Sequence, residues 1–210
     1  MVITELKKRR GRLYLLVFDG RQPVTVDINT FEESPYKVGS SLSDEQLEEL
    51  LLLSQIRRAK EKAFYLLSLR DHSKAELKNK LRKYADDKIA EDTADKMEEL
   101  GLINDLSFAK RRASDLICRK QYPKQRVLRE LCTLGIDSET AQHIIDDMEC
   151  DDVEQALALL DRKYYNKKSN EEDIRKTAAA LARFGFSGDT VRKAINEWKS
   201  KEQDYDVDEL

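Results

Sequence analysis

The sequence predicts a mainly α-helical fold: a tandem array of three three-helix repeats, with a small N-terminal antiparallel β meander. Leu81, Leu131 and Leu181 stand at equal intervals, and similar residues follow each of them. The composition agrees, because 38% charged residues with only 7 Gly and 3 Pro are typical of long solvated helices. Apolar residues alternate near the N-terminus, which predicts strands. A repeat array presents an extended binding surface rather than a single pocket.

Residues 1–40 are predicted to form the β extension. Its three strands are expected where apolar residues alternate, at 2–6, 13–18 and 24–28. Asp19-Gly20 supplies the positive-φ residues of a tight hairpin turn. Pro23 weakens the last strand or places it at an edge, because proline cannot donate to a strand ladder. A sheet this small needs another element to pack against.

A linking helix is predicted over residues 41–56. Ser43 and Gln46 form a capping box, in which the serine hydroxyl accepts a backbone N–H and the glutamine reaches back, so the helix begins near Asp44. Its apolar stripe begins at Leu47. This stripe makes the helix the expected partner of the sheet.

The three repeats are predicted at residues 57–105, 106–150 and 151–200. Gly101, Gly135 and Gly185 fit the left-handed position just after a helix end, where a Cβ would be costly. Ala85 replaces glycine at the equivalent corner of the first repeat, so that corner must be built differently. The third helix of each repeat is expected at 92–100, 138–148 and 188–199. Residues 201–210 are expected to form an acidic, disordered tail.

The sequence contains no recognisable catalytic or cofactor site. It has no phosphate-binding loop, dinucleotide fingerprint, nucleophile elbow or zinc-protease motif. Cys118, Cys132 and Cys150 lack the paired spacing that zinc requires, and we interpret them as reduced packing residues. A catalytic cysteine needs a base, and only His72 and His143 are available. We therefore predict a non-enzymatic protein without a cofactor or metal.

The chain is expected to stay in the cytoplasm. No segment approaches the roughly 18 consecutive apolar residues of a membrane helix. Residues 1–12 contain basic residues but no apolar signal core after them. We expect no membrane contact.

The aromatic residues raise the question of base stacking. Helical spacing and the need of each small repeat for large buried side chains favour packing in the core instead. The residues assigned to the core in this way are Phe64, Tyr65, Phe108, Tyr164, Tyr165, Phe184, Phe186 and Trp198. Tyr122, beside Pro123 and among basic residues, is the best candidate for an exception.

Charge is segregated by helix, although the net charge of the chain is only −3. Residues 108–129 carry eight bases and one acid, a net of +7, whereas residues 130–161 carry ten acids and no Lys or Arg. Solvated helix faces with i,i+4 pairs, such as Arg111 with Asp115, are one explanation. A ridge of one sign also suits an anionic partner or groove. The predicted partner-binding residues are Lys110, Arg111, Arg112, Arg119, Lys120, Tyr122, Lys124, Arg126 and Arg129.

Several motifs occur in a fixed order through the repeats. They are Arg70-Asp71-His72-Ser73, then Leu100-Gly101-Leu102-Ile103-Asn104-Asp105, then Arg129-Glu130-Leu131 with Gly135-Ile136, and finally Leu181-Ala182-Arg183-Phe184-Gly185-Phe186. In these motifs the chain, over about residues 57–198, resembles the RecX family of bacterial regulators of the RecA recombinase. Asn104 stands where many members have Asp, and Gln121 and Pro123 replace the usual glycines around Tyr122.

The resemblance implies an array of three-helix repeats that lies along the groove of the RecA filament on single-stranded DNA. We expect the chain itself to be a monomer. It implies limits on filament growth and on the ATPase, strand-exchange and coprotease activities, and so regulation of DNA repair by homologous recombination and of the SOS response. It implies no reaction. A weak direct contact with DNA is compatible with the basic residues. Two alternatives remain: a direct single-stranded nucleic-acid-binding protein, and an undetected enzyme or purely structural adaptor for other partners.

Overall fold

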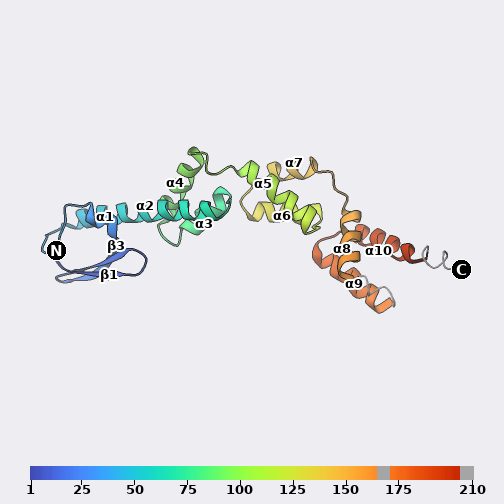
Figure 1. Cartoon of the computed structure of the whole chain (residues 1–210), viewed down its shortest axis with the longest axis horizontal. Helices are drawn as coiled ribbons and strands as arrows, with labels where there is room; N and C mark the ends of the chain where they lie inside the picture. The colour runs from blue at the N-terminus through green and yellow to red at the C-terminus, as the bar shows by residue number, and fades with distance from the viewer. Residues whose placement is uncertain (165–170, 204–210) are drawn as a thin grey trace. The chain divides into compact units, whose positions relative to one another are not determined.

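The computed structural model describes residues 1–164 and 171–203. The chain divides into two compact units, Met1–Asn104 and Asp105–Leu210 (Figure 1). The predicted acidic tail falls outside the described residues from position 204 onward, while the last helix continues to Gln203. No helix in the described part of the chain is long and apolar enough to cross a membrane.

The first unit begins with the predicted antiparallel meander. Strands β1 (Ile3–Arg9), β2 (Leu13–Phe18) and β3 (Arg21–Asp27) form one sheet in the order β1-β2-β3, so Pro23 does lie on an edge strand. In the β2–β3 turn only Gly20 has a positive φ, +75°, so the expectation of two such residues was wrong. The β1–β2 turn has two, Gly11 at +77° and Arg12 at +60°.

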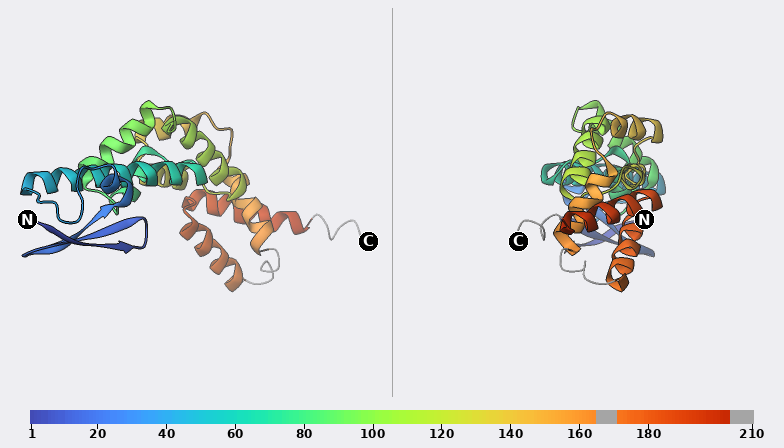
Figure 2. Two further views of the ribbon diagram at one scale, coloured as in Figure 1. Left: turned by 60° about the vertical axis from the view of Figure 1, so that its left-hand side comes forward. Right: turned by 90° about the vertical axis from the view of Figure 1, so that its right-hand side faces the viewer.

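Helices α1 (Ile28–Glu32) and α2 (Asp44–Leu69) follow the sheet. The capping box of Ser43 and Gln46 is present and α2 begins at Asp44, as predicted. The ribbon of the sheet lies beside that of α2 (Figure 2). The two elements share a core of buried side chains, which includes Ile3, Leu16, Phe18, Val26, Leu47 and Leu50. Because residues 54–59 contain no Gly or Pro to end a helix, α2 runs through the boundary predicted at position 57.

The first three-helix repeat consists of the second half of α2 with α3 (Lys74–Leu81) and α4 (Asp87–Glu99). Its core includes Ala63, Leu66, Leu77, Leu81, Ala90 and Met97. Helix α4 begins five residues before the predicted position 92, because the Asp86 side chain caps it by accepting the Ile89 N–H at 2.9 Å. This cap replaces the glycine corner that Ala85 excludes.

The second unit contains the middle and last repeats. The middle repeat has α5 (Asp105–Ser114), a π-helical segment η1 (Asp115–Arg119), α6 (Lys124–Thr133) and α7 (Ser138–Asp146). The last has α8 (Asp152–Tyr164), α9 (Glu171–Phe184) and α10 (Gly188–Gln203). Gly101, Gly135 and Gly185 have φ values of +71°, +82° and +108°, which confirms their predicted role as helix stops. The mainly α fold of three-helix repeats with a β meander is therefore confirmed.

Some predicted core residues are exposed. Phe64 and Tyr65 are 50% and 54% exposed, because they lie on the face of α2 away from Ala63 and Leu66. Cys118 and Cys132 are also exposed, so their interpretation as packing residues was wrong, whereas Cys150 is half-buried. Of the aromatic residues assigned to the core, Phe108, Phe186 and Trp198 are buried, as predicted, and Tyr164 and Phe184 are half-buried against the core of the last repeat. Tyr165 lies outside the described residues.

Candidate partner-binding surface

Helix α5 presents the first predicted bases. Phe108, Ala109 and Ala113 are buried in the core of the middle repeat, so the opposite face of the helix is left to Lys110 and Arg111. Both of these side chains are exposed. The apolar residues of α5 recur at helical spacing and bury one face of the helix, so these two bases point to solvent from the other face.

The π-helical segment η1 concentrates charge around one carboxylate. Asp115 is the one acid among residues 108–129. Its Oδ1 lies 2.7 Å from an Arg119 guanidinium nitrogen, and its Oδ2 lies 3.8 Å from Arg112. The Arg119 side chain remains 82% exposed despite this pair, while Arg112 is half-buried. Arg119 therefore stays available to a partner, because an exposed i,i+4 pair is weak.

A left-handed residue closes the turn after η1. Gln121 has φ of +55°, a conformation that favours glycine. The N–H groups of Gln121 and Tyr122 donate to the carbonyls of Ile117 and Leu116, both at 3.0 Å, so the helix end is satisfied without glycine. The turn holds Lys120 and Tyr122 on either side of this residue.

Tyr122 is packed against other side chains. The Arg126 guanidinium carbon lies 3.8 Å from the centre of the Tyr122 ring, and the Phe184 ring meets it edge-on at 5.5 Å. The Lys120 ammonium lies 5.6 Å from the same ring. The structure therefore places this predicted stacking residue in a contact between the middle and last repeats.

Arg126 and Lys124 also join the two repeats. Arg126 donates to the Phe184 carbonyl at 2.9 Å, at the end of α9. The Lys124 backbone N–H donates to Asp152 Oδ1 at 3.0 Å, and its ammonium lies 3.4 Å from the Met148 carbonyl. Because Pro123 offers no side-chain cap, Asp152 of α8 caps α6 across the repeat boundary. These two bases are partly buried in structural contacts.

Gly185 allows this contact to form. A Cβ on Gly185 would lie 3.3 Å from the Arg126 Cβ and 3.6 Å from the Pro123 Cγ. The left-handed glycine thus stops α9 and also lets its end approach α6 closely. Lys163 completes the cluster, with its ammonium 5.0 Å from the centre of the Phe184 ring.

Five of the nine predicted residues remain exposed, and we call them the exposed basic set. They are Lys110, Arg111, Arg119, Lys120 and Arg129. The exposed positions of α6, which include Arg129, lie opposite its buried Val127 and Leu131.

The structure thus divides the predicted site into three parts. The exposed basic set faces solvent from α5, η1 with its following turn, and α6. Tyr122, Lys124 and Arg126 hold the two repeats together, and the half-buried Arg112 lies beside Asp115 within the middle repeat.

The acidic helix α7 has a shallow hollow on its surface. Asp137, Asp146 and Asp147 line it together with His143. The pKa of Asp137 is lowered because its carboxylate accepts the Thr140 backbone N–H, at 2.9 Å, as the cap of α7. In the ranges that the structure describes, no group of three or more His, Cys, Asp or Glu side chains is placed to hold a metal.

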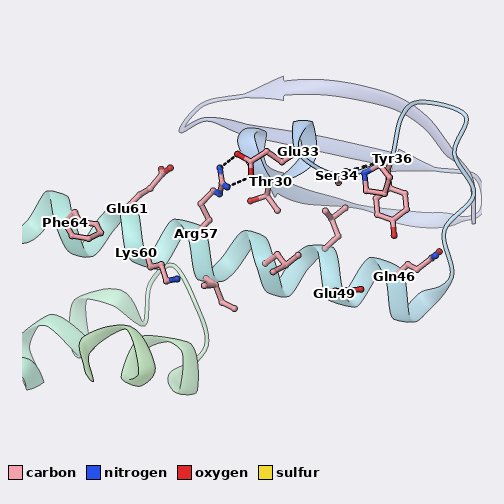
Figure 3. A pocket seen from close by; sticks show the side chains of 14 residues that line it. Thr30, Glu33, Ser34, Tyr36, Gln46, Glu49, Arg57, Lys60, Glu61 and Phe64 are labelled. Atoms are coloured by element: carbon pink, nitrogen blue, oxygen red, sulfur yellow. Dashed lines mark hydrogen bonds and ion pairs between the residues drawn. The ribbon is translucent and has the colours of Figure 1, made fainter. Parts of the chain in front are cut away.

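A groove in the first unit has no counterpart in the sequence predictions. It has a volume of about 780 Å³ and lies between α1 with its following loop and one face of α2 (Figure 3). Arg57 of α2 forms an ion pair with Glu33 at its edge, and Leu53 and Phe64 supply exposed apolar surface. The Ser34 hydroxyl donates to the Phe31 carbonyl at 2.7 Å. The short helix α1, which apolar periodicity did not reveal, builds one wall of the groove.

Family models match two parts of the chain. A model described as the first three-helix domain of RecX matches residues 59–97, and one described as the third three-helix domain of RecX matches residues 149–195. The two matches fall within the first and last repeats.

Relatives named "Regulatory protein RecX" resemble most of the chain. The relative from Clostridioides difficile strain 630 is 26% identical over 217 residues, which cover 98% of this chain and 99% of the relative. The relative from Stenotrophomonas maltophilia strain R551-3 is 34% identical over 138 residues, covering 64% of this chain and 83% of the relative.

Solved structures share the fold. A crystal structure of regulatory protein RecX has a TM-score of 0.57 and 18% identity, covering 93% of this chain and 98% of the other. RecX from Lactobacillus salivarius has a TM-score of 0.55 and 24% identity, covering 70% and 98%. Together with the Stenotrophomonas relative, these similarities lead to one conclusion: the chain belongs to the RecX family of regulatory proteins.

Proposed function

We propose that this chain regulates RecA by binding the RecA filament on single-stranded DNA. It limits filament growth and the ATPase, strand-exchange and coprotease activities, and thereby controls homologous recombination and the SOS response in the bacterial cytoplasm. It catalyses no reaction and acts by occupying a surface. Membership in the RecX family, with three-helix repeats along the chain, is the observation that carries this proposal.

The exposed basic set is the proposed contact with the filament. Its side chains face solvent from one repeat. Asp115, the one acid within residues 108–129, is already paired with Arg112 and Arg119. Cations in such a cluster complement an anionic protein groove or the phosphates within it. Lys124 and Arg126 are left out of the contact, because their functional groups are engaged between the repeats.

The test is a triple charge reversal, Lys110→Glu with Lys120→Glu and Arg129→Glu. If each exposed contact contributes about 0.2–1 kcal/mol and reversal adds repulsion, half-inhibition of the RecA ATPase on single-stranded DNA should require about 10- to 100-fold more protein. The ATPase rate is measured over a concentration series with RecA of the same bacterium. Unchanged potency would remove the exposed basic set from the contact.

The matched control reverses three exposed bases of the last repeat, Arg175, Lys176 and Lys193. It changes the net charge of the chain by the same amount, so general electrostatic repulsion is held constant. The control should inhibit the ATPase like the unmodified chain. An equal decrease of potency in both triple variants would mean that net charge, rather than a local contact, controls binding.

Direct binding to single-stranded nucleic acid is the second candidate, favoured by the same exposed bases. Base stacking on Tyr122 does not support it, because Arg126 lies over that ring at 3.8 Å. A direct binder should retain labelled single-stranded DNA without RecA, with affinity falling steeply as salt rises. If it binds such DNA and leaves the RecA ATPase unaffected, the second candidate replaces the first.

A further inference from the structure

A small pocket in the first unit is lined by cations. It has a volume of about 330 Å³ and lies between α2, β3 and the corner that joins α3 to α4, where Ala85 replaces the glycine of the other repeats. We call it the corner pocket. No Asp or Glu is among the described residues that line it. Its charged lining residues are Arg58, Arg82 and Lys83, and its hydroxyl-bearing ones are Thr25, Ser54 and Tyr84.

Helix α2 places Arg58 in the corner pocket. Ser54 and Arg58 are one helical turn apart and therefore share a face of the helix, and both line the pocket. Arg58 is half-buried, yet within residues 1–164 and 171–203 it forms no hydrogen bond or ion pair. Partial removal of a guanidinium from water is unfavourable when no acceptor replaces the water. An anion in the pocket would be the missing acceptor.

The corner between α3 and α4 has a fixed backbone. The N–H groups of Tyr84 and Ala85 donate to the Leu81 carbonyl at 2.8 and 3.2 Å. The Asp86 N–H donates to Gln55 Oε1 of α2 at 3.2 Å, which ties the corner to that helix. The pocket is therefore formed before a ligand arrives, and binding costs little conformational freedom.

The two cations of the corner differ in their contacts. The Arg82 guanidinium donates to Asp87 through Nε and to Asn79 Oδ1 through Nη1, the latter at 2.6 Å. Its Nη2 has no hydrogen-bond acceptor in the part of the chain that the structure describes. Lys83 is exposed and forms no ion pair with any described residue. The pocket thus offers one cation that an acid neutralises and two that none does.

The helix dipole explains only part of this charge. Arg82 and Lys83 follow the last turn of α3, where cations interact favourably with the helix end. Arg58 lies in the middle of α2, so this reason does not apply to it. The larger groove of the first unit is lined by Glu33 and Glu49 as well as by bases, whereas the corner pocket has unbalanced positive charge. Such a pocket attracts an anionic ligand.

Hydroxyl groups accompany the cations. Ser54 is only 2% exposed, and its Oγ accepts the Asp27 N–H at 2.7 Å. The Ser54 hydroxyl itself donates to no acceptor among the described residues. A phosphate group has three acceptor oxygens and a charge of about −1.5 to −2, so it can accept from several such donors at once. A carboxylate has two oxygens and a single charge, and it matches this set of donors less well.

We propose that the corner pocket binds a phosphate group. Arg58 and Lys83 supply the positive charge, while the Ser54 hydroxyl and Arg82 Nη2 supply further donors. The phosphate belongs either to a small molecule of about nucleotide size, since the volume is at the lower end of the usual range for ligand pockets, or to the backbone of a nucleic acid. The corner pocket belongs to the first repeat, so this inference does not rest on the proposed contact of the middle repeat with RecA.

The test is a titration of the full chain, labelled with nitrogen-15 and without RecA, with inorganic phosphate at constant ionic strength. Amide chemical shifts are followed by NMR. Saturable shifts should occur around the pocket, at the amides of Ser54, Tyr84 and Asp86. A parallel titration with acetate should give no saturable shift there. Equal saturable shifts with acetate would make the pocket a general anion site and contradict its selectivity for phosphate.

The test variant combines Arg58→Gln with Lys83→Gln. Its dissociation constant for phosphate should rise at least about tenfold, because both uncompensated cations are removed. The matched control, Lys60→Gln with Lys88→Gln, removes the same charge from exposed positions on α2 and α4 and should stay within about twofold of the unmodified chain. Arg58→Lys should give an intermediate affinity, because an ammonium keeps the charge without the planar fork. Unchanged amide shifts away from the pocket show that each variant is folded.

Two further ligands distinguish the sources of the phosphate. A nucleoside monophosphate that binds more tightly than inorganic phosphate, with the same dependence on Arg58, supports a small-molecule ligand. A short single-stranded oligonucleotide without a terminal phosphate that displaces inorganic phosphate from the pocket supports the nucleic-acid backbone. The inference is overturned if phosphate gives no saturable shifts at the pocket, or if the Arg58 and Lys83 variant binds phosphate as tightly as its control. Because the assay contains no RecA, either failure leaves the proposed regulation of RecA unaffected.

Discussion

Replacing Arg126 by alanine should destabilise the second unit, because Arg126 joins the middle repeat to the last. The change removes a charged hydrogen bond to the Phe184 carbonyl, 2.9 Å long, which typically contributes about 1.5–3 kcal/mol. It also removes the stack over Tyr122 and Phe184, which adds about 0.5–1 kcal/mol for a half-buried guanidinium. The free energy of unfolding is therefore expected to fall by about 2–4 kcal/mol.

Urea unfolding followed by tryptophan fluorescence measures this decrease directly. The chain has a single tryptophan, Trp198, which is fully buried in the last repeat and donates to Asp161 at 2.9 Å. With a denaturant slope of about 2 kcal/mol per molar, the midpoint should fall by about 1–2 M. The Arg126→Lys variant should show nearly the same decrease in the midpoint, because an ammonium cannot reproduce the planar stack.

Arg129→Ala is the matched control, since it removes the same charge from an exposed position on the same helix. It should change the free energy of unfolding by no more than about 0.5 kcal/mol. Equal midpoints for Arg126→Ala and Arg129→Ala would refute the structural role of Arg126. Arg126 would then return to the candidate contact with RecA.

Three further outcomes are expected. Gly185→Ala should lower the free energy of unfolding by about 1–2 kcal/mol, because position 185 has a φ of +108°. Gly188→Ala is the control and should change it little, because nothing lies within 4 Å of a Cβ there. Equal urea midpoints for the two variants would contradict this expectation. Asp152→Ala should weaken the capping of α6 by about 1 kcal/mol and speed amide hydrogen exchange at Lys124, and unchanged exchange there would argue against the cap. Burial lowers the pKa of His72, so the folded state binds fewer protons than the unfolded state. The free energy of unfolding of the first unit, measured by circular dichroism, should therefore be highest well above about pH 6.5 and should fall as the pH drops below it. If a His72→Gln variant showed an equally steep pH dependence, His72 would not be the cause of it.

Local chemistry made the helix ends predictable. Gly101 and Gly135 end helices in left-handed conformations, and the capping box at Ser43 starts α2, because each signal depends on one or two neighbouring residues. The same dependence explains two failures. Helix α1 has only five residues, which is too short for an apolar stripe to show. The early start of α4 depends on the cap by Asp86, which lies at the corner where Ala85 replaces the glycine of the other repeats.

The candidate site was predictable only as a segment of positive charge. Linear sequence shows how many bases lie between positions 108 and 129, but the role of each depends on its neighbours in space. The carbonyl that engages Arg126 belongs to a residue 58 positions away, and Asp152 reaches Lys124 from 28 positions away. No local pattern in the sequence identifies these contacts, so the division of the bases required the structure.

The cap that Asp152 provides to α6 makes the middle repeat incomplete by itself. A chain cut after position 150 would lack that carboxylate together with the Phe184 carbonyl. The Lys124 amide would have no acceptor, and the guanidinium of Arg126 would turn from a repeat contact into a free surface cation. Such a fragment would bind anionic ligands more tightly than the same residues do in the full chain. Binding sites mapped with truncated fragments would therefore overstate the affinity of the middle repeat for DNA, whereas point substitutions in the full chain would not.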